Sequence, residues 1–153
     1  RGQAKEEVIE PTVSLKCSAY IPEEYISDPH HRLTLYRRLT SAKTDDEITA
    51  IELELLDRYG KVPEPLSRLL ETVTLKVLAR FGHVIKISQE EKGVSFLLDA
   101  TIPMKENILN LLLKKFKGKI QLKTPFSFVL AIADDSHEAI FCETLDCLTV
   151  LKG

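Results

Sequence analysis

Three acidic residues share one edge of a predicted helix. Glu47, Glu54 and Asp57 are spaced seven and three residues apart, which lines up their carboxylates along that helix. A helix C-terminus carries roughly half a unit of negative charge, so Glu54 and Asp57 lie where carboxylates are unfavourable, and Arg58 offsets part of this effect. Carboxylates at such a position indicate guanidinium partners on another domain or another protein. The alternative is an ordinary solvated helix face.

Motifs for catalysis or cofactor binding are missing from the sequence. It contains no phosphate loop of the GxxxxGK[ST] or GxGxxG type and no HExxH or GxSxG motif. Cys17, Cys142 and Cys147 form no CxxC pair, which is typical of a reducing cytosol; we expect them to be unpaired, with Cys142 and Cys147 buried. The adjacent His30 and His31 point about 100° apart on a helix, so we expect exposed histidines without a metal. We therefore predict no enzyme, no cofactor and a cytoplasmic location.

Length and charge narrow the class of protein further. With 153 residues and a net charge of −2, the chain has the size of one domain and lacks the basic excess of a nucleic-acid-binding protein. It contains no apolar run of transmembrane length and no signal peptide. The chain opens with Arg1, Gly2 and Gln3 and not with Met, which suggests a piece of a longer protein.

The acidic residues belong to a helix predicted over residues 44–59. Thr44 and Glu47 form a capping box at its start, and Gly60 ends it with a left-handed turn. Its buried stripe is predicted to consist of Ile48, Ile51, Leu55, Leu56 and Tyr59.

The remaining elements complete an α+β pattern. We predict a linker tail over residues 1–11 and a single domain over residues 12–153, with a helical N-terminal half and a small mixed sheet that carries helices mainly on one face. Strands are expected at residues 12–19, 84–88, 94–99, 120–123 and 126–133, the last one central and covered on both faces. Further helices are expected at residues 29–41, 65–81, 103–116 and 135–151, the last starting with a capping box from Asp135 to Glu138. For these four helices, taken in the same order, the residues expected to face inward are Leu33, Tyr36 and Leu39; Leu66, Leu69, Leu70, Val73, Val77 and Phe81; Ile108, Leu109, Leu112, Leu113 and Phe116; and Ile140, Phe141, Leu145 and Leu148.

Two groups of basic residues have more than one interpretation. Arg32, Arg37 and Arg38 form a small patch that could contact an acidic partner or only keep the surface soluble. Lysines 114, 115, 117 and 119 suit the negative end of the helix predicted over residues 103–116, although a phosphate-binding role is the alternative.

Five short blocks of the sequence resemble one protein family. The blocks are IPEEYI (residues 21–26), RLTLYRRL (32–39), SAKT (41–44), ELLDRYG (54–60) and PEP (63–65). In this order they resemble the C-terminal domain of bacterial transcription-repair coupling factors (TRCF). The resemblance is dense over residues 11–81 and thinner afterwards, where only the order of the elements supports it.

This resemblance implies a role in nucleotide-excision repair. Coupling factors are multi-domain proteins that recognise RNA polymerase stalled at DNA damage, displace it with an ATP- and Mg-dependent DNA translocase (helicase) motor, and recruit the repair protein UvrA. The C-terminal domain is not the motor: it docks on an N-terminal module resembling UvrB, masks the surface that UvrA needs and restrains the motor.

The resemblance also implies the contact residues. The two acids of the family's ELxDR(F/Y)G block, which contact arginines of the UvrB-like module, fall on Glu54 and Asp57, with Tyr59 at the aromatic position. Glu47 and Arg58 complete the expected interdomain contact. Two other interpretations are a docking module of a multi-domain cytosolic protein unrelated to repair, with the arginine patch as its contact surface, and a small enzyme with a pocket on the sheet.

Overall fold

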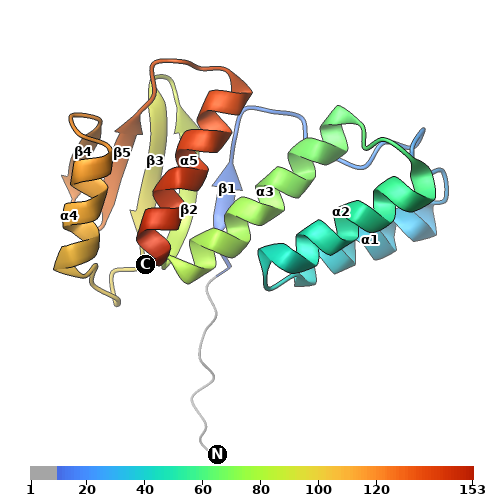
Figure 1. The fold of residues 1–153 in the computed structure, drawn as a ribbon, viewed down its shortest axis with the longest axis horizontal. Coiled ribbons are helices and arrows are strands. Elements are labelled where there is room, and N and C mark those ends of the chain that lie inside the picture. The colour runs from blue at the N-terminus through green and yellow to red at the C-terminus, as the bar shows by residue number, and fades with distance from the viewer. Residues whose placement is uncertain (1–9) are drawn as a thin grey trace, which may run out of the picture.

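The computed structural model describes residues 10–153, which form an α+β fold with a helical N-terminal half, as predicted (Figure 1). Of the predicted linker, residues 1–9 lie outside the described residues, whereas Glu10 pairs with Arg80 at 2.7 Å and Pro11 is buried. The elements, in chain order, are β1 (Thr12–Ser14), α1 (Pro29–Ser41), α2 (Asp45–Tyr59), α3 (Glu64–Phe81), β2 (Val84–Glu90), β3 (Gly93–Leu98), α4 (Glu106–Lys115), β4 (Ile120–Thr124), β5 (Ser127–Ala131) and α5 (His137–Lys152).

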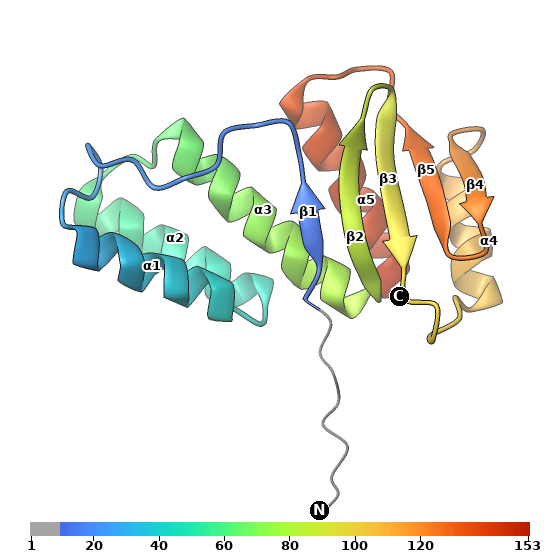
Figure 2. The same ribbon diagram turned by 180° about the vertical axis from the view of Figure 1, so that it is seen from behind.

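One mixed sheet forms the C-terminal half. Its strand order is β1-β2-β3-β5-β4, with β1 parallel to β2 and every other neighbouring pair antiparallel. Helices α3, α4 and α5 lie on one face of the sheet, and no helix formed by residues 10–153 lies on the opposite face (Figures 1 and 2). This confirms the predicted arrangement of helices on one face.

Strand β5 lies inside the sheet, between β3 and β4, but the prediction that it is covered on both faces is wrong. Phe128 and Leu130 are buried under the helices, whereas Ala131 is exposed on the other face. Nearly continuous apolar sequence predicts a strand covered twice, yet here only one face has a helix layer. The first strand is also shorter than predicted and ends at Ser14.

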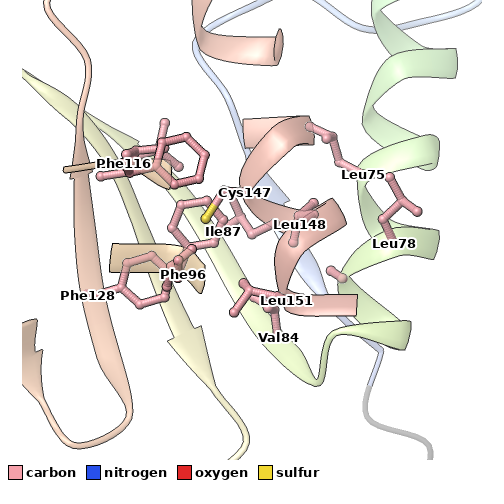
Figure 3. Packing of buried hydrophobic residues seen from close by; sticks show 14 of the residues in the cluster. Leu75, Leu78, Val84, Ile87, Phe96, Phe116, Phe128, Cys147, Leu148 and Leu151 are labelled. Carbon is pink, nitrogen blue, oxygen red and sulfur yellow. The ribbon is translucent and has the colours of Figure 1, made fainter. Parts of the chain in front are cut away.

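Two hydrophobic cores share helix α3. One core fills the space between the sheet and α3, α4 and α5, and includes Phe96 and Phe128, whose rings stack with centroids 4.8 Å apart (Figure 3). The other core joins α1, α2 and α3 in the helical half. The predicted single stripe of α3 is therefore incomplete: Leu66 and Val77 face the helical core, and Leu75 faces the sheet core. Phe81, predicted to be buried, is exposed at the helix end.

In α1 the predicted stripe is wrong at two positions. Leu35 and Leu39 are buried, whereas Leu33 and Tyr36 are exposed. Leu33 and Leu35 are two residues apart and so point about 200° apart on a helix, which means that only one of them can face the core. The Tyr36 hydroxyl instead accepts a hydrogen bond from the Ile21 N–H at 3.0 Å.

In the C-terminal half, the start of α4, the capping residue of α5 and the exposure of two side chains also differ from the prediction. Helix α4 begins at Glu106, later than expected, and Leu113 is exposed. Helix α5 is capped by Ser136, whose hydroxyl accepts from the Ala139 N–H at 3.3 Å, and not by Asp135. Cys142 is exposed, whereas Cys147 is buried as predicted. Among residues 10–153, no helix combines the length and apolar composition needed to cross a membrane.

Candidate docking site on the helical half

Glu47 takes part in the hydrogen bonds that cap the start of α2. The Thr44 hydroxyl accepts a hydrogen bond from the Glu47 N–H at 3.2 Å, and the Glu47 carboxylate accepts one from the Lys43 N–H at 2.7 Å. This is a variant of the predicted capping box in which the glutamate reaches one residue further back. Glu47 also lies about 15 Å along the helix from Asp57, given a rise of about 1.5 Å per residue. The structure therefore separates Glu47 from the acids at the C-terminal end.

Glu54 has an arginine partner within its own domain. The Arg38 guanidinium, on the neighbouring helix α1, donates a hydrogen bond to the Glu54 carboxylate, and both side chains are partly exposed. This hydrogen bond and the charge of Arg38 hold the pKa of Glu54 below its ordinary value, and the charge of Arg58 contributes further. The expectation that the partner of Glu54 lies only outside this chain is therefore wrong. The sequence contained both residues, but not the packing of α1 on α2 that brings them together.

Asp57 remains available to an outside partner. It lies one turn after Glu54 on α2 and is exposed, and it forms no ion pair with any residue between 10 and 153. Its carboxylate stands at the negative end of the helix, where it stabilises the fold least. Of the predicted acid pair, Asp57 is thus the carboxylate whose charge the domain itself leaves unmatched.

The C-terminal turn of α2 is held in place by Tyr25. Its hydroxyl lies 3.0 Å from the Leu55 carbonyl oxygen in the last turn and 2.8 Å from the carbonyl oxygen of Gly60, which lies beyond the last intrahelical hydrogen bond. The Tyr25 and Tyr59 rings have centroids 5.5 Å apart, and the Arg58 guanidinium lies 5.2 Å from the Tyr59 ring centroid. Burial and the neighbouring Tyr59 raise the pKa of Tyr25, so its hydroxyl stays protonated.

Gly60 makes this turn possible. Its φ of 86° and ψ of −160° confirm the predicted positive φ but lie outside the left-handed helical region, in a part of conformational space reserved almost entirely for glycine. The Gly60 N–H donates to the Leu56 carbonyl at 3.1 Å. The hydrogen bonds of the Tyr25 hydroxyl and the Gly60 N–H hold the last turn of α2, which lowers the entropy cost of a contact made at Asp57.

Two leucines next to the acids are exposed. The side chain of Leu53 is 61% exposed and that of Leu56 is 51% exposed, although Leu56 was predicted to be buried. The core side of α2 is formed by Ile48, Ile51 and Leu55, which leaves Leu53 and Leu56 on the outer side. An apolar centre with a polar rim is the usual arrangement of a protein interface, and two exposed leucines next to a carboxylate could form such a surface. The sequence analysis missed this surface because it placed Leu56 in the buried stripe of the helix and gave Leu53 no role.

The arginine patch of α1 does not exist as a free cationic surface. Arg32 donates to the Ile26 and Ser27 carbonyl groups at 2.7 and 3.0 Å and lies 3.7 Å from Glu23. Arg38 is paired with Glu54, which leaves Arg37 as the exposed member that no ion pair with residues 10–153 engages. A small hollow of about 70 Å³ lies between α1 and α2, with Leu35 and Leu55 in its lining and Arg38, Glu54 and Arg58 beside them.

The histidines and cysteines form no cluster of the kind that binds metal. His30 and His31 are exposed, as predicted, and His31 lies 3.7 Å from Asp28. Within residues 10–153, no three His, Cys, Asp or Glu side chains are arranged to hold a metal ion. Burial raises the pKa of Cys147 far above its usual range, so its thiol stays protonated.

Comparison with known proteins matches this chain to one family. Residues 15–108, which include α1, α2 and α3, match the family model described as the TRCF domain. Transcription-repair-coupling factors of three bacteria are similar in sequence. That of Myxococcus xanthus is 43% identical over 77 residues (50% of this chain, 6% of the relative), and that of Escherichia coli K12 is 37% identical over 81 residues (53% and 7%). The Helicobacter pylori protein is 33% identical over 119 residues (72% and 12%).

A solved structure shares the whole fold. The crystal structure of the C-terminal domain of a transcription-repair coupling factor superposes with a TM-score of 0.81, covers 94% of each chain and is 19% identical in sequence. The chain spans only 6–12% of the length of the three relatives above, so it corresponds to a small part of proteins of that size.

Proposed function

This chain belongs to the TRCF domain family, and on that basis we propose that it acts as a docking domain that restrains a transcription-repair coupling factor. In this proposal, the C-terminal end of α2 docks on a UvrB-like N-terminal module of the same parent chain. Docking masks the surface that UvrA binds and keeps the motor of the parent inactive. The domain itself carries out no catalysis.

The proposal extends to the parent protein. We propose that the parent is an ATP- and Mg-dependent DNA translocase of the bacterial cytoplasm that acts in nucleotide-excision repair. RNA polymerase and DNA are bound by its other domains. The domain described here needs no cofactor for docking, because an ion-pair contact requires only matching charged groups.

The observation that supports this role best is the charge of Asp57, which no ion pair with residues 10–153 matches, at a helix end held by hydrogen bonds from Tyr25 and Gly60. Asp57 lies beside the exposed Leu53 and Leu56, so one surface offers a carboxylate and an apolar area together. An arginine of the docked module can pair with Asp57 directly. It can reach Glu54 only by sharing or replacing the bond to Arg38, because that carboxylate is already engaged. Asp57 is therefore the primary contact and Glu54 the secondary one.

Glu47 and Arg58 have supporting parts in this proposal. Glu47 orders the start of α2 through its bond to the Lys43 N–H, and Arg58 lies over the Tyr59 ring beside Asp57. Either residue can touch the docked module at the edge of the contact, but neither supplies an unmatched charge as favourable as that of Asp57.

The expected strength of the contact suits a reversible restraint. Exposed ion pairs contribute only about 0–1 kcal/mol each. Interfaces between domains of one chain bury roughly 600–1,500 Å² and are more polar than permanent ones. Such a contact can therefore open when a competing partner binds one of the two surfaces.

The direct test measures binding of this domain to the separately expressed UvrB-like module by calorimetry. We expect Asp57→Asn to weaken binding several-fold, Glu54→Gln to weaken it less, and added salt to weaken the wild-type interaction because exposed charges are screened. The matched control is Asp46→Asn, which removes an exposed carboxylate at the opposite end of α2. Equal affinity of Asp57→Asn and wild type would refute the assigned contact.

A second test uses the full-length parent protein. Replacing both Glu54 and Asp57 by Ala should raise its affinity for UvrA while leaving the domain folded. If the affinity for UvrA stays at its wild-type value although the variant is folded, this surface does not mask the UvrA site. The domain would then be a docking module for another partner, as the alternative reading holds.

A further inference from the structure

The sheet ends at β4, which has a neighbouring strand on one side only. In the strand order β1-β2-β3-β5-β4, β4 pairs with β5, and residues 10–153 place no strand along its other side, which we call the free edge. At the opposite end of the sheet, β1 has only three residues, and short edge strands are one way in which proteins avoid further pairing. β4 has five residues, and all but one of its side chains are exposed. It therefore offers more room for an additional strand than β1 does.

The main-chain groups of β4 point alternately toward β5 and toward the free edge. The Ala131 N–H of β5 donates to the Lys119 carbonyl, which lies directly opposite, at 2.8 Å. In an antiparallel pair, positions that exchange hydrogen bonds alternate with positions that do not. Lys119 and Gln121 therefore bond to β5, whereas the N–H and C=O groups of Ile120 and Leu122 point to the free edge.

The other side of β5 supports the same assignment. At the two ends of the β3–β5 pair, the Leu98 N–H donates to the Phe126 carbonyl at 2.7 Å and the Ile132 N–H donates to the Lys92 carbonyl at 3.0 Å. Alternation from either end directs the main chain of Leu130 toward β3. Leu130 therefore forms no hydrogen bond with the position opposite it on β4, whose own groups remain available to a strand at the free edge.

An apolar strip lies along the helix side of the free edge. Leu122 is paired with Phe128 across β4 and β5, and residues opposite each other project from the same face of a sheet. Phe128 is buried under the helices, yet the Leu122 side chain is 59% exposed, because no strand of residues 10–153 lies beyond it. Leu109 of α4 lines the same hollow as Leu122, and Leu113, one turn later on that side of α4, is exposed. A strand beside β4 would cover these leucines.

The position of α4 limits what can pair with β4. This helix lies over β4 at the outer end of the helix layer, in front of the strand in Figure 1 and behind it in Figure 2. Two copies joined through their β4 strands would hold these strands about 4.8 Å apart. Their α4 helices would then lie closer than the roughly 8–10 Å that packed helices need. A single extended segment brings no helix of its own, so it fits beneath α4 where a second copy does not.

We propose that the free edge of β4 binds an extended segment of a partner protein, which joins the five-stranded sheet as an additional antiparallel strand. Main-chain hydrogen bonds to Ile120 and Leu122 hold the segment, and its alternate apolar side chains pack under α4 against Leu109, Leu113 and Leu122. The chemistry recognised is an extended segment in which apolar and polar residues alternate, since side chains project alternately from the two faces of a sheet. This proposal does not depend on the docking function of α2.

The test titrates a nine-residue peptide, in which Val alternates with Thr, Lys or Glu, into the isotope-labelled domain. NMR follows the hydrogen exchange of the amides of β4. In the free domain, the amides of Ile120 and Leu122 should exchange rapidly, whereas that of Gln121 is protected by its bond to β5. Saturating peptide should slow exchange at Ile120 and Leu122 at least tenfold and shift the resonances of β4 and α4.

Two N-methylated peptides test the main-chain contact without changing the protein. In an antiparallel pair whose Val side chains lie on the helix side, the Val N–H groups face Ile120 and Leu122, and the other N–H groups face solvent. Methyl groups on the Val nitrogens should therefore weaken binding at least tenfold. Methyl groups on the Thr, Lys and Glu nitrogens should leave most of the affinity in place.

Protein variants separate the main chain of β4 from its side chains. Leu122→Pro removes the outward N–H but no hydrogen bond to β5, and proline is tolerated on an edge strand where the N–H faces solvent. Leu122→Thr keeps this N–H and removes the apolar contact. We expect Leu122→Thr to weaken binding about fivefold and Leu122→Pro to weaken it further. Circular dichroism checks that both variants are folded, and the N-methylated peptides carry the main-chain test if Leu122→Pro is not.

A matched pair of leucines on α4 locates the segment beneath this helix. Leu111 and Leu113 are both exposed, but they are two residues apart and so point about 200° apart. Leu113→Ser should weaken binding about fivefold, and Leu111→Ser should have no effect. Asp57→Asn should have no effect either, which separates this site from the α2 contact.

Any of three results would overturn the proposal. The first is an equal loss of affinity with either set of N-methyl groups. The second is unchanged exchange at Ile120 and Leu122 with millimolar peptide present. The third is a set of peptide-induced shift changes that map to α1 and α2 and leave β4 and α4 unchanged.

Discussion

The Arg38 guanidinium on α1 donates a hydrogen bond to the Glu54 carboxylate on α2, whereas Asp57, one turn further along α2, has no such partner among residues 10–153. Two acids that the sequence presents as a pair are therefore not equivalent. Glu54 already has a counter-charge, while Asp57 presents its full charge to the surroundings. An external arginine meets less competition at Asp57, which is why the proposed contact centres there.

The Arg38–Glu54 bond predicts a pH-dependent contribution to stability. The pKa of Glu54 is lowered mainly by its hydrogen bond from Arg38. A carboxyl group whose pKa is lower in the folded than in the unfolded state stabilises the fold above its unfolded pKa, and this contribution is lost as the pH falls through the folded pKa. Arg38→Gln should raise the pKa of Glu54 toward its ordinary value in an NMR titration. The variant should be less stable at neutral pH by no more than about 1 kcal/mol, because the pair is partly exposed, and equal to wild type in strong acid.

Asp134 is the internal control for this titration. Its pKa is lowered by hydrogen bonds from Ser136, far along the chain from Arg38, so Arg38→Gln should leave it unchanged. An unaltered Glu54 titration in the variant would mean that the bond to Arg38 does not persist in solution.

The exposed leucines of α2 should matter for docking but not for folding. Because Leu53 and Leu56 are largely exposed, the double change to Ser should alter the free energy of unfolding by no more than about 1 kcal/mol, measured by urea denaturation. Binding to the UvrB-like module should weaken. In contrast, Leu55→Ala removes a buried side chain and should cost about 2–5 kcal/mol. Normal docking of the Leu53→Ser, Leu56→Ser variant would remove these leucines from the contact.

Helix α3 should make the two cores unfold together. It contributes Leu66 to the helical core and Leu75 to the sheet core, so each of the changes Leu66→Ala and Leu75→Ala should cost about 2–5 kcal/mol. All four tyrosines, at positions 20, 25, 36 and 59, lie in the N-terminal half and report on it by fluorescence. Circular dichroism reports on the whole chain. In Leu75→Ala, both signals should therefore move to the same lower denaturant midpoint.

Separate midpoints would contradict this coupling. If tyrosine fluorescence in Leu75→Ala kept its wild-type midpoint while circular dichroism fell in two steps, the helical half would be stable without the sheet core.

The cysteines should react with N-ethylmaleimide in the order Cys142, Cys17, Cys147. Cys142 is exposed, Cys17 is half-buried with a pKa raised by burial, and Cys147 is fully buried with a strongly raised pKa. Only thiolates react readily, so burial slows the reaction both by excluding the reagent and by keeping the proton on sulfur. Mass spectrometry of digested samples measures each rate. Labelling of Cys147 at the rate of Cys142 in the folded protein would contradict the packing of α5 on the sheet.

Elements whose signals are local could be predicted from the sequence. Helix α2 begins after Thr44 and ends before Gly60 because the cap hydroxyl and the positive φ of glycine act on their immediate neighbours. The arrangement of helices on one face of a mixed sheet also follows from the order and periodicity of the elements. The acids of the candidate site were found in this way, from their spacing on one helix.

Only the tertiary structure decided which of two neighbouring residues is buried in the core and which of two caps a helix. Leu35 and not Leu33 faces the core, Leu56 is exposed beside the buried Leu55, and Ser136 and not Asp135 caps α5. The pairing of Arg38 with Glu54 joins residues of two helices, 16 positions apart. Periodicity determines that a helix has an apolar side, but the direction of that side is set by the helices it packs against. The same packing decides which charges are matched inside the domain and which remain for a partner.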